Sequence, residues 1–202
     1  DTGRGTITLN GAPLALGGTG SEGRSRRAAG MAHVPEDRQR EGLIMDFQAW
    51  ENTAFGYHRA PEYQAGLLMD NAAIKRDTQE KMERFDVRPP NPGLEAKNFS
   101  GGNQQKIVLA REIECDPDLL LIGQPTRGVD IGAIEFIHEQ IIALRDQGKA
   151  ILLVSVELEE ILSLSDRVVV MFDGTLMGER NPDQTDEKEL GLLMAGMEAQ
   201  NP

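Results

Sequence analysis

The chain has little cysteine and no long apolar run. Cys115 is the one cysteine among 202 residues, which excludes an internal disulfide. A lone cysteine favours a reducing compartment and is most often a buried thiol. The longest apolar runs, such as Ala150–Val154 and Val168–Phe172, are far shorter than the ~20 residues of a membrane-spanning helix. No signal peptide is recognisable, so the sequence predicts a cytoplasmic protein.

Basic residues are also scarce. The 21 Lys and Arg residues face 33 Asp and Glu residues, which gives a net charge of −12. This balance argues against a chain built to grip nucleic acid, although one local site can still bind phosphate. The three histidines, His33, His58 and His138, lack metal-ligand spacing and are interpreted as structural. Because the chain begins at Asp1 without an initiator methionine, we expect a fragment of a longer protein.

The stretch that organises the chain is Ser100-Gly101-Gly102-Asn103. Two glycines after a serine predict a tight turn whose backbone can approach a ligand closely. From Asn103 onward the apolar spacing predicts a helix. The backbone N–H groups at a helix start favour phosphate. The alternative is a serine-capped helix that binds no ligand.

The rest of the chain alternates between strand and helix signals. Asn10-Gly11 predicts a β-hairpin turn, and Asp173-Gly174 predicts a second turn. Residues 17–20 are predicted to be loop. Strands are predicted over residues 6–9, 12–14, 31–35, 119–122, 150–155, 168–172 and 175–178, and helices over 21–29, 132–147, 158–164 and 186–197. The pattern predicts an α/β fold with a mostly parallel sheet and small antiparallel hairpins.

Residues 43–92 differ from this body because they are more polar and helical. One helix is predicted within residues 46–57. A second is predicted within 70–87, and the prolines of residues 89–93 end this segment. We predict a helical subdomain at 43–92 inserted into a body formed by 1–42 and 93–202. The second helix should bury one stripe of side chains: Ile74, Thr78, Met82 and Phe85.

Three separated motifs together resemble the nucleotide-binding subunits of ABC transporters. They are Asn98-Phe-Ser-Gly-Gly-Asn-Gln-Gln-Lys106, the strand at 119–122 with Gly123-Gln-Pro-Thr-Arg-Gly-Val-Asp130, and Leu153-Val-Ser155. With Val34-Pro-Glu-Asp-Arg38, they are most similar to the second ATPase half of tandem-domain importers for simple sugars and nucleosides. The resemblance covers nearly the whole chain and implies a P-loop NTPase-like fold.

The departures from the family pattern lie at catalytic positions. The phosphate-binding loop G-x-x-x-x-G-K-[ST] is absent from these residues, so the chain resembles an N-terminally truncated domain. The family places an aspartate and a glutamate where Gly123 and Gln124 stand, and a histidine where Val156 stands. Glycine cannot hold Mg²⁺ through a side chain, and a neutral amide cannot accept a proton from water. We therefore predict that this chain alone is catalytically inactive.

The resemblance implies a role in a composite site. In the family, each ATP lies between one domain's phosphate-binding loop and the other's signature. Ser100, Gly101, Gly102 and Asn103 would face the γ-phosphate, while the partner half of the same polypeptide would hold Mg²⁺. A membrane permease would be the second partner, with no nucleic acid involved. The protein would be peripheral, on the cytoplasmic side of a bacterial inner membrane, and would contact the membrane through the permease alone.

Two further candidate residues each have a structural alternative. Asp130 would carry signals between the two ATP sites, or would cap the helix that follows it. Glu36, in the segment Glu36-Asp37-Arg38, would sense nucleotide, or would belong to an exposed charged loop. The alternative for the whole chain is a non-catalytic regulatory or interaction module that keeps the fold. A chromosome-maintenance or translation ATPase would require coiled-coil heptads or a basic linker, and neither is present.

Overall fold

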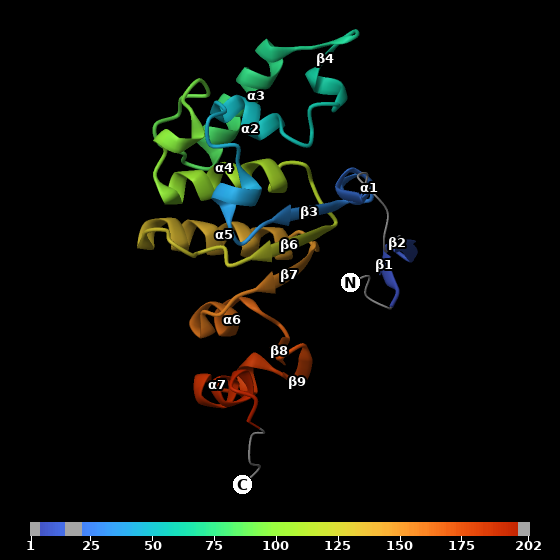
Figure 1. The fold of residues 1–202 in the computed structure, drawn as a ribbon, viewed down its shortest axis with the longest axis vertical. Coiled ribbons are helices and arrows are strands. Elements are labelled where there is room, and N and C mark those ends of the chain that lie inside the picture. The colour runs from blue at the N-terminus through green and yellow to red at the C-terminus, as the bar shows by residue number, and fades with distance from the viewer. Residues whose placement is uncertain (1–4, 15–21, 198–202) are drawn as a thin grey trace.

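A three-stranded parallel sheet lies at the centre of the molecule (Figure 1). The computed structural model describes residues 5–14 and 22–197. The strands are β3 (Met31–Val34), β6 (Leu119–Gly123) and β7 (Ala150–Val154), in the order β3-β6-β7. Because all three run in the same direction, their carboxyl ends meet at one edge, where α/β folds place their ligand sites.

The main core lies between one face of this sheet and two helices. Helix α4 (Gly101–Ile113) and helix α5 (Ile131–Asp146) contribute Ile107, Leu109, Ile137 and Ile141, all of which are buried. Helix α5 buries residues at helical spacing: Ala133, Ile137, Ile141 and Leu144. From the sheet, the same core receives Ala32, Val34, Leu120 and Ile122.

The opposite sheet face is much less covered in the described part of the chain. It carries His33, Leu121, Leu152 and Val154, and the last two are 56% and 59% exposed. An apolar run such as residues 119–122 is typical of a strand that is buried on both faces. In the structure, its side chains instead alternate between buried and partly buried positions. Alternation of this kind is typical of a sheet that is packed on one side.

Residues 43–92 contain two helices and a small hairpin. Helix α3 (Asn71–Arg84) is capped by the Asp70 side chain and buries the predicted stripe of Ile74, Thr78, Met82 and Phe85. The other elements are α2 (Ala49–Ala54), a 3₁₀ turn (Pro61–Tyr63), β4 (Gln64–Ala65) and β5 (Leu68–Met69). The β4–β5 hairpin is missing from our sequence analysis, because two-residue strands are too short to produce an alternating pattern.

The remaining elements surround the sheet. Asn10 and Gly11 both have positive φ, which confirms the predicted primed turn between β1 (Ile7–Leu9) and β2 (Ala12–Leu14). Strand β8 pairs with β9 across the predicted Asp173-Gly174 turn, so in the described chain it does not extend the parallel sheet. The other bounds are α1 (Glu22–Ala28), α6 (Leu158–Leu164), β8 (Val168–Phe172), β9 (Thr175–Arg180) and α7 (Glu187–Met194). The loop predicted at 17–20 falls outside the described residues.

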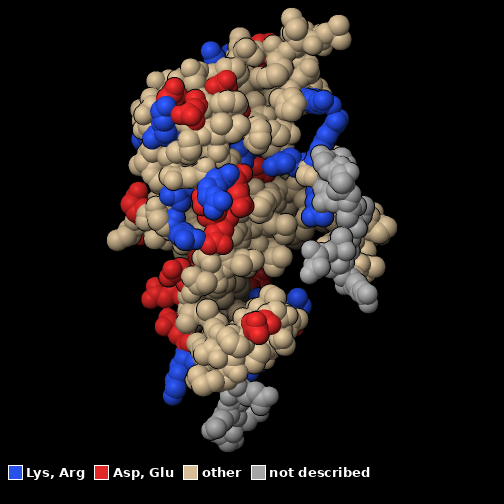
Figure 2. Space-filling view, viewed as in Figure 1, with Lys and Arg blue, Asp and Glu red and all other residues tan. Residues whose placement is uncertain are grey.

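Charged side chains of both signs are intermixed on the molecular face shown in Figure 2, rather than separated into a basic stripe. Within the described residues, no helix combines the length and apolar composition needed to cross a membrane.

Candidate functional site

Helix α4 begins earlier than the sequence predicted. Gly101 and Gly102 form its first turn rather than a tight turn before it, so the predicted boundary at Asn103 is wrong by two residues. Ser100 is the N-cap, and its Oγ accepts hydrogen bonds from the Asn103 backbone N (3.4 Å) and from Nδ2 (2.9 Å). A serine hydroxyl also has one hydrogen to donate. Because Ser100 is exposed, that donor is available at the surface.

Close packing explains why both first-turn residues of α4 are glycines. A Cβ atom at Gly101 would lie 2.7 Å from Arg38 Nη2 and 2.8 Å from the Gly128 carbonyl oxygen. At Gly102 a Cβ would lie 2.9 Å from an Asp130 carboxylate oxygen and 3.1 Å from the Ala133 Cβ. At both positions, these distances are shorter than the ordinary van der Waals separation of a Cβ atom from its neighbours. The two glycines therefore let the segments around Arg38 and Asp130 approach the helix start.

Asp130 is the N-cap of α5. Its Oδ1 accepts a hydrogen bond from the Ala133 backbone N at 2.9 Å, which confirms the structural alternative for this residue. The same exposed carboxylate faces the first turn of α4. The structure thus brings Asp130 beside Gly102, although 28 positions separate them in the sequence.

Glu36 lies at the carboxyl end of β3, where it forms an ion pair with Arg127. Both side chains are exposed, so the pair adds little stability. An exposed charged loop is one of the two interpretations that the sequence allows for the charged segment after this strand. Its latter part is a π-helix at Arg38–Gly42. The Asp37 carboxylate caps the start of this helix by accepting hydrogen bonds from the backbone N–H groups of residues 39 and 40. Arg127 belongs to the loop between β6 and α5, whose Gly128 packs against Gly101 and which ends at Asp130.

The carboxyl end of β6 offers no carboxylate of its own. Gly123 packs so closely on Glu36 that a Cβ there would lie 3.3 Å from the Glu36 backbone nitrogen. Gln124 has a φ of +47° and accepts a hydrogen bond from the Val156 backbone N through its side-chain oxygen at 3.4 Å. Glycine has no side-chain ligand for Mg²⁺, and a neutral amide cannot act as a general base. The carboxyl end of β6 therefore supplies neither a carboxylate ligand for Mg²⁺ nor a base for water.

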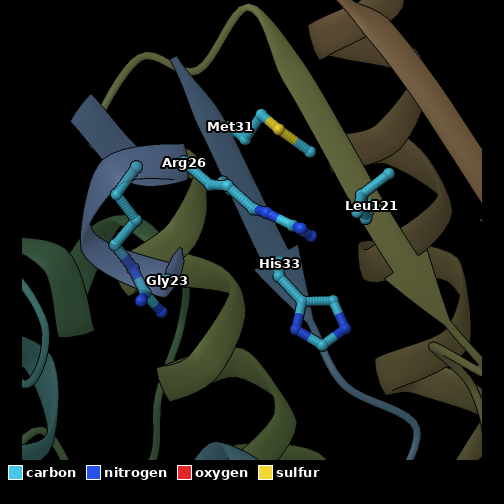
Figure 3. Close-up of a pocket in the computed structure, with 7 residues that line it drawn as sticks. Gly23, Arg26, Met31, His33 and Leu121 are labelled. Atoms are coloured by element: carbon cyan, nitrogen blue, oxygen red, sulfur yellow. The ribbon is translucent and has the colours of Figure 1, made fainter. Parts of the chain in front are cut away.

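A shallow pocket of about 240 Å³ lies beside the candidate residues, lined by Glu36, Asp37, Arg38, Gln39, Arg127 and Gly128. In the described part of the chain, two larger hollows lie elsewhere. One, of about 410 Å³, is between α1 and β3, where Arg26, Met31 and His33 project from the two elements (Figure 3). The other, also about 410 Å³, lies between β7 and β8. We take the smaller pocket as the candidate site, because it adjoins the glycine-rich helix start.

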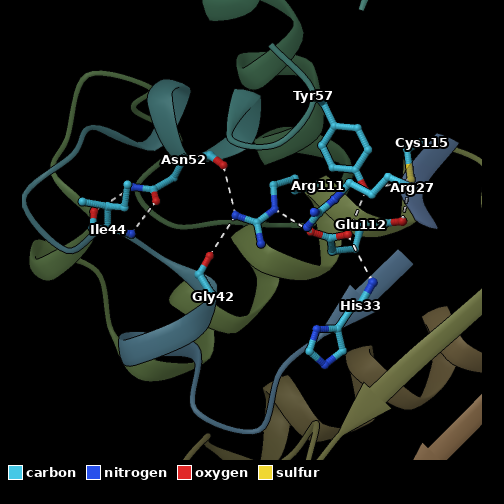
Figure 4. A network of polar contacts seen from close by, with 9 residues as sticks. All are labelled: Arg27, His33, Gly42, Ile44, Asn52, Tyr57, Arg111, Glu112 and Cys115. Carbon is cyan, nitrogen blue, oxygen red and sulfur yellow. Dashed lines mark hydrogen bonds and ion pairs between the residues drawn. The ribbon is translucent and has the colours of Figure 1, made fainter. Parts of the chain in front are cut away.

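A buried polar network surrounds the opposite end of α4 (Figure 4). The Glu112 side chain is 0% exposed and accepts hydrogen bonds from Arg111 Nε (2.7 Å) and the Tyr57 hydroxyl (2.8 Å). Arg111 also donates to the backbone oxygens of Gly42 (2.8 Å) and Asn52 (3.2 Å). Burial, followed by the Glu112 charge, raises the pKa of Tyr57. The network joins α4 to residues 43–92, and no local sequence pattern predicts it because its members are far apart in the chain.

Cys115 is exposed, so the sequence expectation of a buried thiol is wrong. The residue follows the end of α4, and its sulfur donates a hydrogen bond to the Glu112 carbonyl oxygen at 3.0 Å. Although the residue as a whole is exposed, its sulfur is partly desolvated, and this raises the pKa of the Cys115 thiol. Of the histidines, His138 pairs with the buried Glu160 at 3.0 Å and so contributes to packing between α5 and α6.

Comparison with known proteins finds relatives that belong to one family. A sequence model of the ABC transporter family matches residues 1–127. The guanosine import ATP-binding protein NupO of Bacillus subtilis (strain 168) is 45% identical over 196 residues, which is 96% of this chain and 38% of NupO. The nucleoside import ATP-binding protein NupA of Lactococcus lactis subsp. cremoris (strain MG1363) is 48% identical over 82% of this chain and 33% of NupA.

A more distant relative and a solved structure agree with this pattern. The ribose import ATP-binding protein RbsA of Clostridium perfringens (strain 13 / Type A) is 34% identical over 96% of this chain and 38% of RbsA. The chain thus spans 33% to 38% of the length of these three relatives. The dimeric structure of a bacterial ABC transporter cassette matches 89% of this chain and 74% of its own, with a TM-score of 0.70 and 20% identity. This likeness establishes the cassette fold.

Proposed function

The chain belongs to the ABC transporter family, and from that premise we propose that it is the signature-donating, catalytically silent half of an ATP-binding subunit. Ser100, Gly101, Gly102 and Asn103 complete an ATP site whose phosphate-binding loop and Mg²⁺ belong to a partner half of the same polypeptide. Glu36 and Asp130 adjoin that site. The subunit drives an importer for nucleosides or simple sugars, the solutes named for NupO, NupA and RbsA.

The observation that carries this proposal is the geometry at the start of α4. The Ser100 oxygen already accepts two hydrogen bonds from Asn103, which leaves its hydrogen as the remaining donor on an exposed residue. The first backbone N–H groups of a helix favour a negative charge in the same place. A phosphate group that arrives from a second domain therefore meets donors that are already oriented. Bound ATP would supply that phosphate, and this chain's part is to stabilise its charge.

The residues at the carboxyl end of β6 support the proposal that this half of the subunit is catalytically silent. Gly123 and Gln124 provide neither a carboxylate ligand for Mg²⁺ nor a base that deprotonates water, so the site that they border does not hydrolyse ATP. Residues 43–92 receive a membrane permease in this arrangement. The subunit is peripheral, on the cytoplasmic face of the membrane, and touches the lipid bilayer only through that permease.

The test is ATP turnover by the full-length subunit assembled with its permease, in which Ser100→Asp is compared with Ser100→Asn. Both residues are good N-caps, so α4 keeps its start in each variant. Only aspartate places a negative charge against the phosphate, and we expect its turnover to fall by about a hundredfold relative to Ser100→Asn. Equal turnover in the two variants contradicts the donor role.

A second variant tests whether this half is silent. Gln124→Asn keeps a neutral side chain that tolerates positive φ, and we expect turnover within about twofold of the wild type. A large loss would show that Gln124 takes part in hydrolysis, against the proposal.

One observation favours a different function, a non-catalytic interaction module with the same fold. Because Gly101 and Gly102 are required for packing against Arg38 and Asp130, this part of the signature would persist without any nucleotide. The Ser100 variants separate the two functions, since packing does not depend on the charge at that exposed position. Turnover that is insensitive to Ser100→Asp favours the interaction module.

A further inference from the structure

Arg38 joins three segments that meet at the candidate site. The residue is the first of the π-helix that follows β3. Its guanidinium donates to the Arg127 carbonyl oxygen through Nη1 (2.7 Å) and to the Gly128 carbonyl oxygen through Nη2 (3.1 Å). The two bonded carbonyls belong to consecutive residues of the loop between β6 and α5. A single planar group thus holds the backbone of that loop at two points.

The same guanidinium lies against the first turn of α4. A Cβ at Gly101 would meet Arg38 Nη2 at 2.7 Å and the Gly128 carbonyl oxygen at 2.8 Å. Gly101, Arg38 and Gly128 therefore fit together only while position 101 has no side chain. Any displacement of the loop from Arg38 changes the surroundings of the turn that carries Ser100.

The π-helix that carries Arg38 is itself fixed to the body of α4. The Gln39 side-chain amide donates to the Gln104 side chain at 3.0 Å. At the other end of the π-helix, the Gly42 carbonyl accepts the Arg111 hydrogen bond. The π-helix that carries Arg38 is therefore hydrogen-bonded to α4 at two positions, Gln104 and Arg111. The loop is thereby positioned relative to α4 and not only relative to β6.

We propose that Arg38 is a positioning residue that clamps the 127–128 backbone against the first turn of α4, and so fixes Asp130 and the Ser100 donor in one arrangement. The effect of Arg38 on ATP turnover rests on the function proposed above, whereas its contacts with the backbone of residues 127–128 do not depend on that function. Lysine cannot replace arginine here, because one ammonium nitrogen does not reproduce a planar fork that reaches two carbonyls.

The first experiment measures the clamp without ATP. Hydrogen exchange of the amides in residues 126–130 is compared among wild type, Arg38→Ala, Arg38→Lys and Arg40→Ala. Arg40 is an exposed arginine on the same π-helix, so its variant removes an equal charge while the clamp stays intact. We expect exchange to become about tenfold faster in both Arg38 variants and to stay unchanged in Arg40→Ala. Unchanged exchange in Arg38→Ala overturns the clamp, whatever the function of the protein.

The second experiment measures ATP turnover by the full-length subunit in the same variants. Loss of positioning lowers kcat by about tenfold in Arg38→Ala and Arg38→Lys, with KM for ATP changed by less than about threefold. Faster exchange with an unchanged kcat overturns the positioning role. If Ser100→Asp also leaves turnover unchanged, the proposed function itself has failed, so the two failures are distinguishable.

A double-mutant cycle provides a third readout. Gly101→Ala forces its new Cβ against Arg38 and Gly128, and we expect it to lower kcat in the wild-type background. In the Arg38→Ala background the loop is already released, so the same substitution should have a smaller effect. Equal effects in the two backgrounds contradict the contact between Arg38 and the first turn of α4.

Discussion

The two ends of helix α4 are held by different kinds of interaction. The first turn is exposed at Ser100, and close packing against Arg38, Gly128 and Asp130 fixes its glycines. The last turn buries an ion pair, Arg111–Glu112, whose side chains are 3% and 0% exposed. Tyr57 and Arg111 direct hydrogen-bond donors at the buried Glu112 carboxylate, whereas Ser100 at the start of the helix is exposed. One helix therefore combines an anchored end that fixes its position with an open end that presents donors.

The largest expected effect on stability comes from removing the buried carboxylate of Glu112 at the last turn of α4. Glu112→Ala leaves Arg111 buried without its carboxylate partner, and we expect the free energy of unfolding to fall by about 3–5 kcal/mol. Urea denaturation followed by circular dichroism measures the change. The matched control is Glu114→Ala, which removes an ion pair with the exposed Arg84 and should cost less than about 1 kcal/mol. Similar losses in the two variants would contradict the contrast between the ends of α4.

The next effect concerns the packed first turn. Gly102→Ala places a Cβ 2.9 Å from the Asp130 carboxylate, so we expect a destabilisation of about 1–3 kcal/mol. Gly191 lies in helix α7, and a Cβ there would have no neighbour within 4 Å. Gly191→Ala should therefore stabilise the protein by about 0.5–1 kcal/mol. Denaturation midpoints compare the two variants, and a stabilising Gly102→Ala would show that the crowding is not real.

The smallest effect lies between the two ends, where Lys106 of α4 pairs with Asp86. Hydrogen bonding to Arg88 is the main cause that lowers the pKa of Asp86, with a further contribution from Lys106. A lowered folded-state pKa means that the stabilisation is present above the unfolded pKa of about 4 and is lost as pH falls through the folded value. Asp86 is half-exposed, so we expect less than about 1 kcal/mol.

A comparison of wild type and Asp86→Asn in urea at pH 7 and pH 3 tests this contribution. The variant should be less stable than wild type at pH 7, and the difference should shrink at pH 3. A difference that grows on acidification would contradict the direction of the pKa shift.

Much of the local structure could be predicted because its signals are short-range. Asn10-Gly11 and Asp173-Gly174 form the expected turns with positive φ, and Asp130 forms the expected cap. The candidate residues at the start of α4 also came from a contiguous motif. In contrast, the apolar character of residues 119–122 predicted a strand without indicating that it lies between β3 and β7 in the sheet. Spacing along the chain identifies a strand, but it does not identify its neighbour.

The sequence by itself determined the order of most strands and helices, the family, and the absence of acidic residues at the end of β6. Only the tertiary structure decided why Gly101 must be glycine, since Gly128 and Arg38, 27 and 63 positions away, crowd it. It also decided that Arg111 and Glu112 are buried rather than solvated, although charged residues on a helix most often face water. Capping and turn preferences act within a few residues, whereas close approach and desolvation depend on segments that folding brings together.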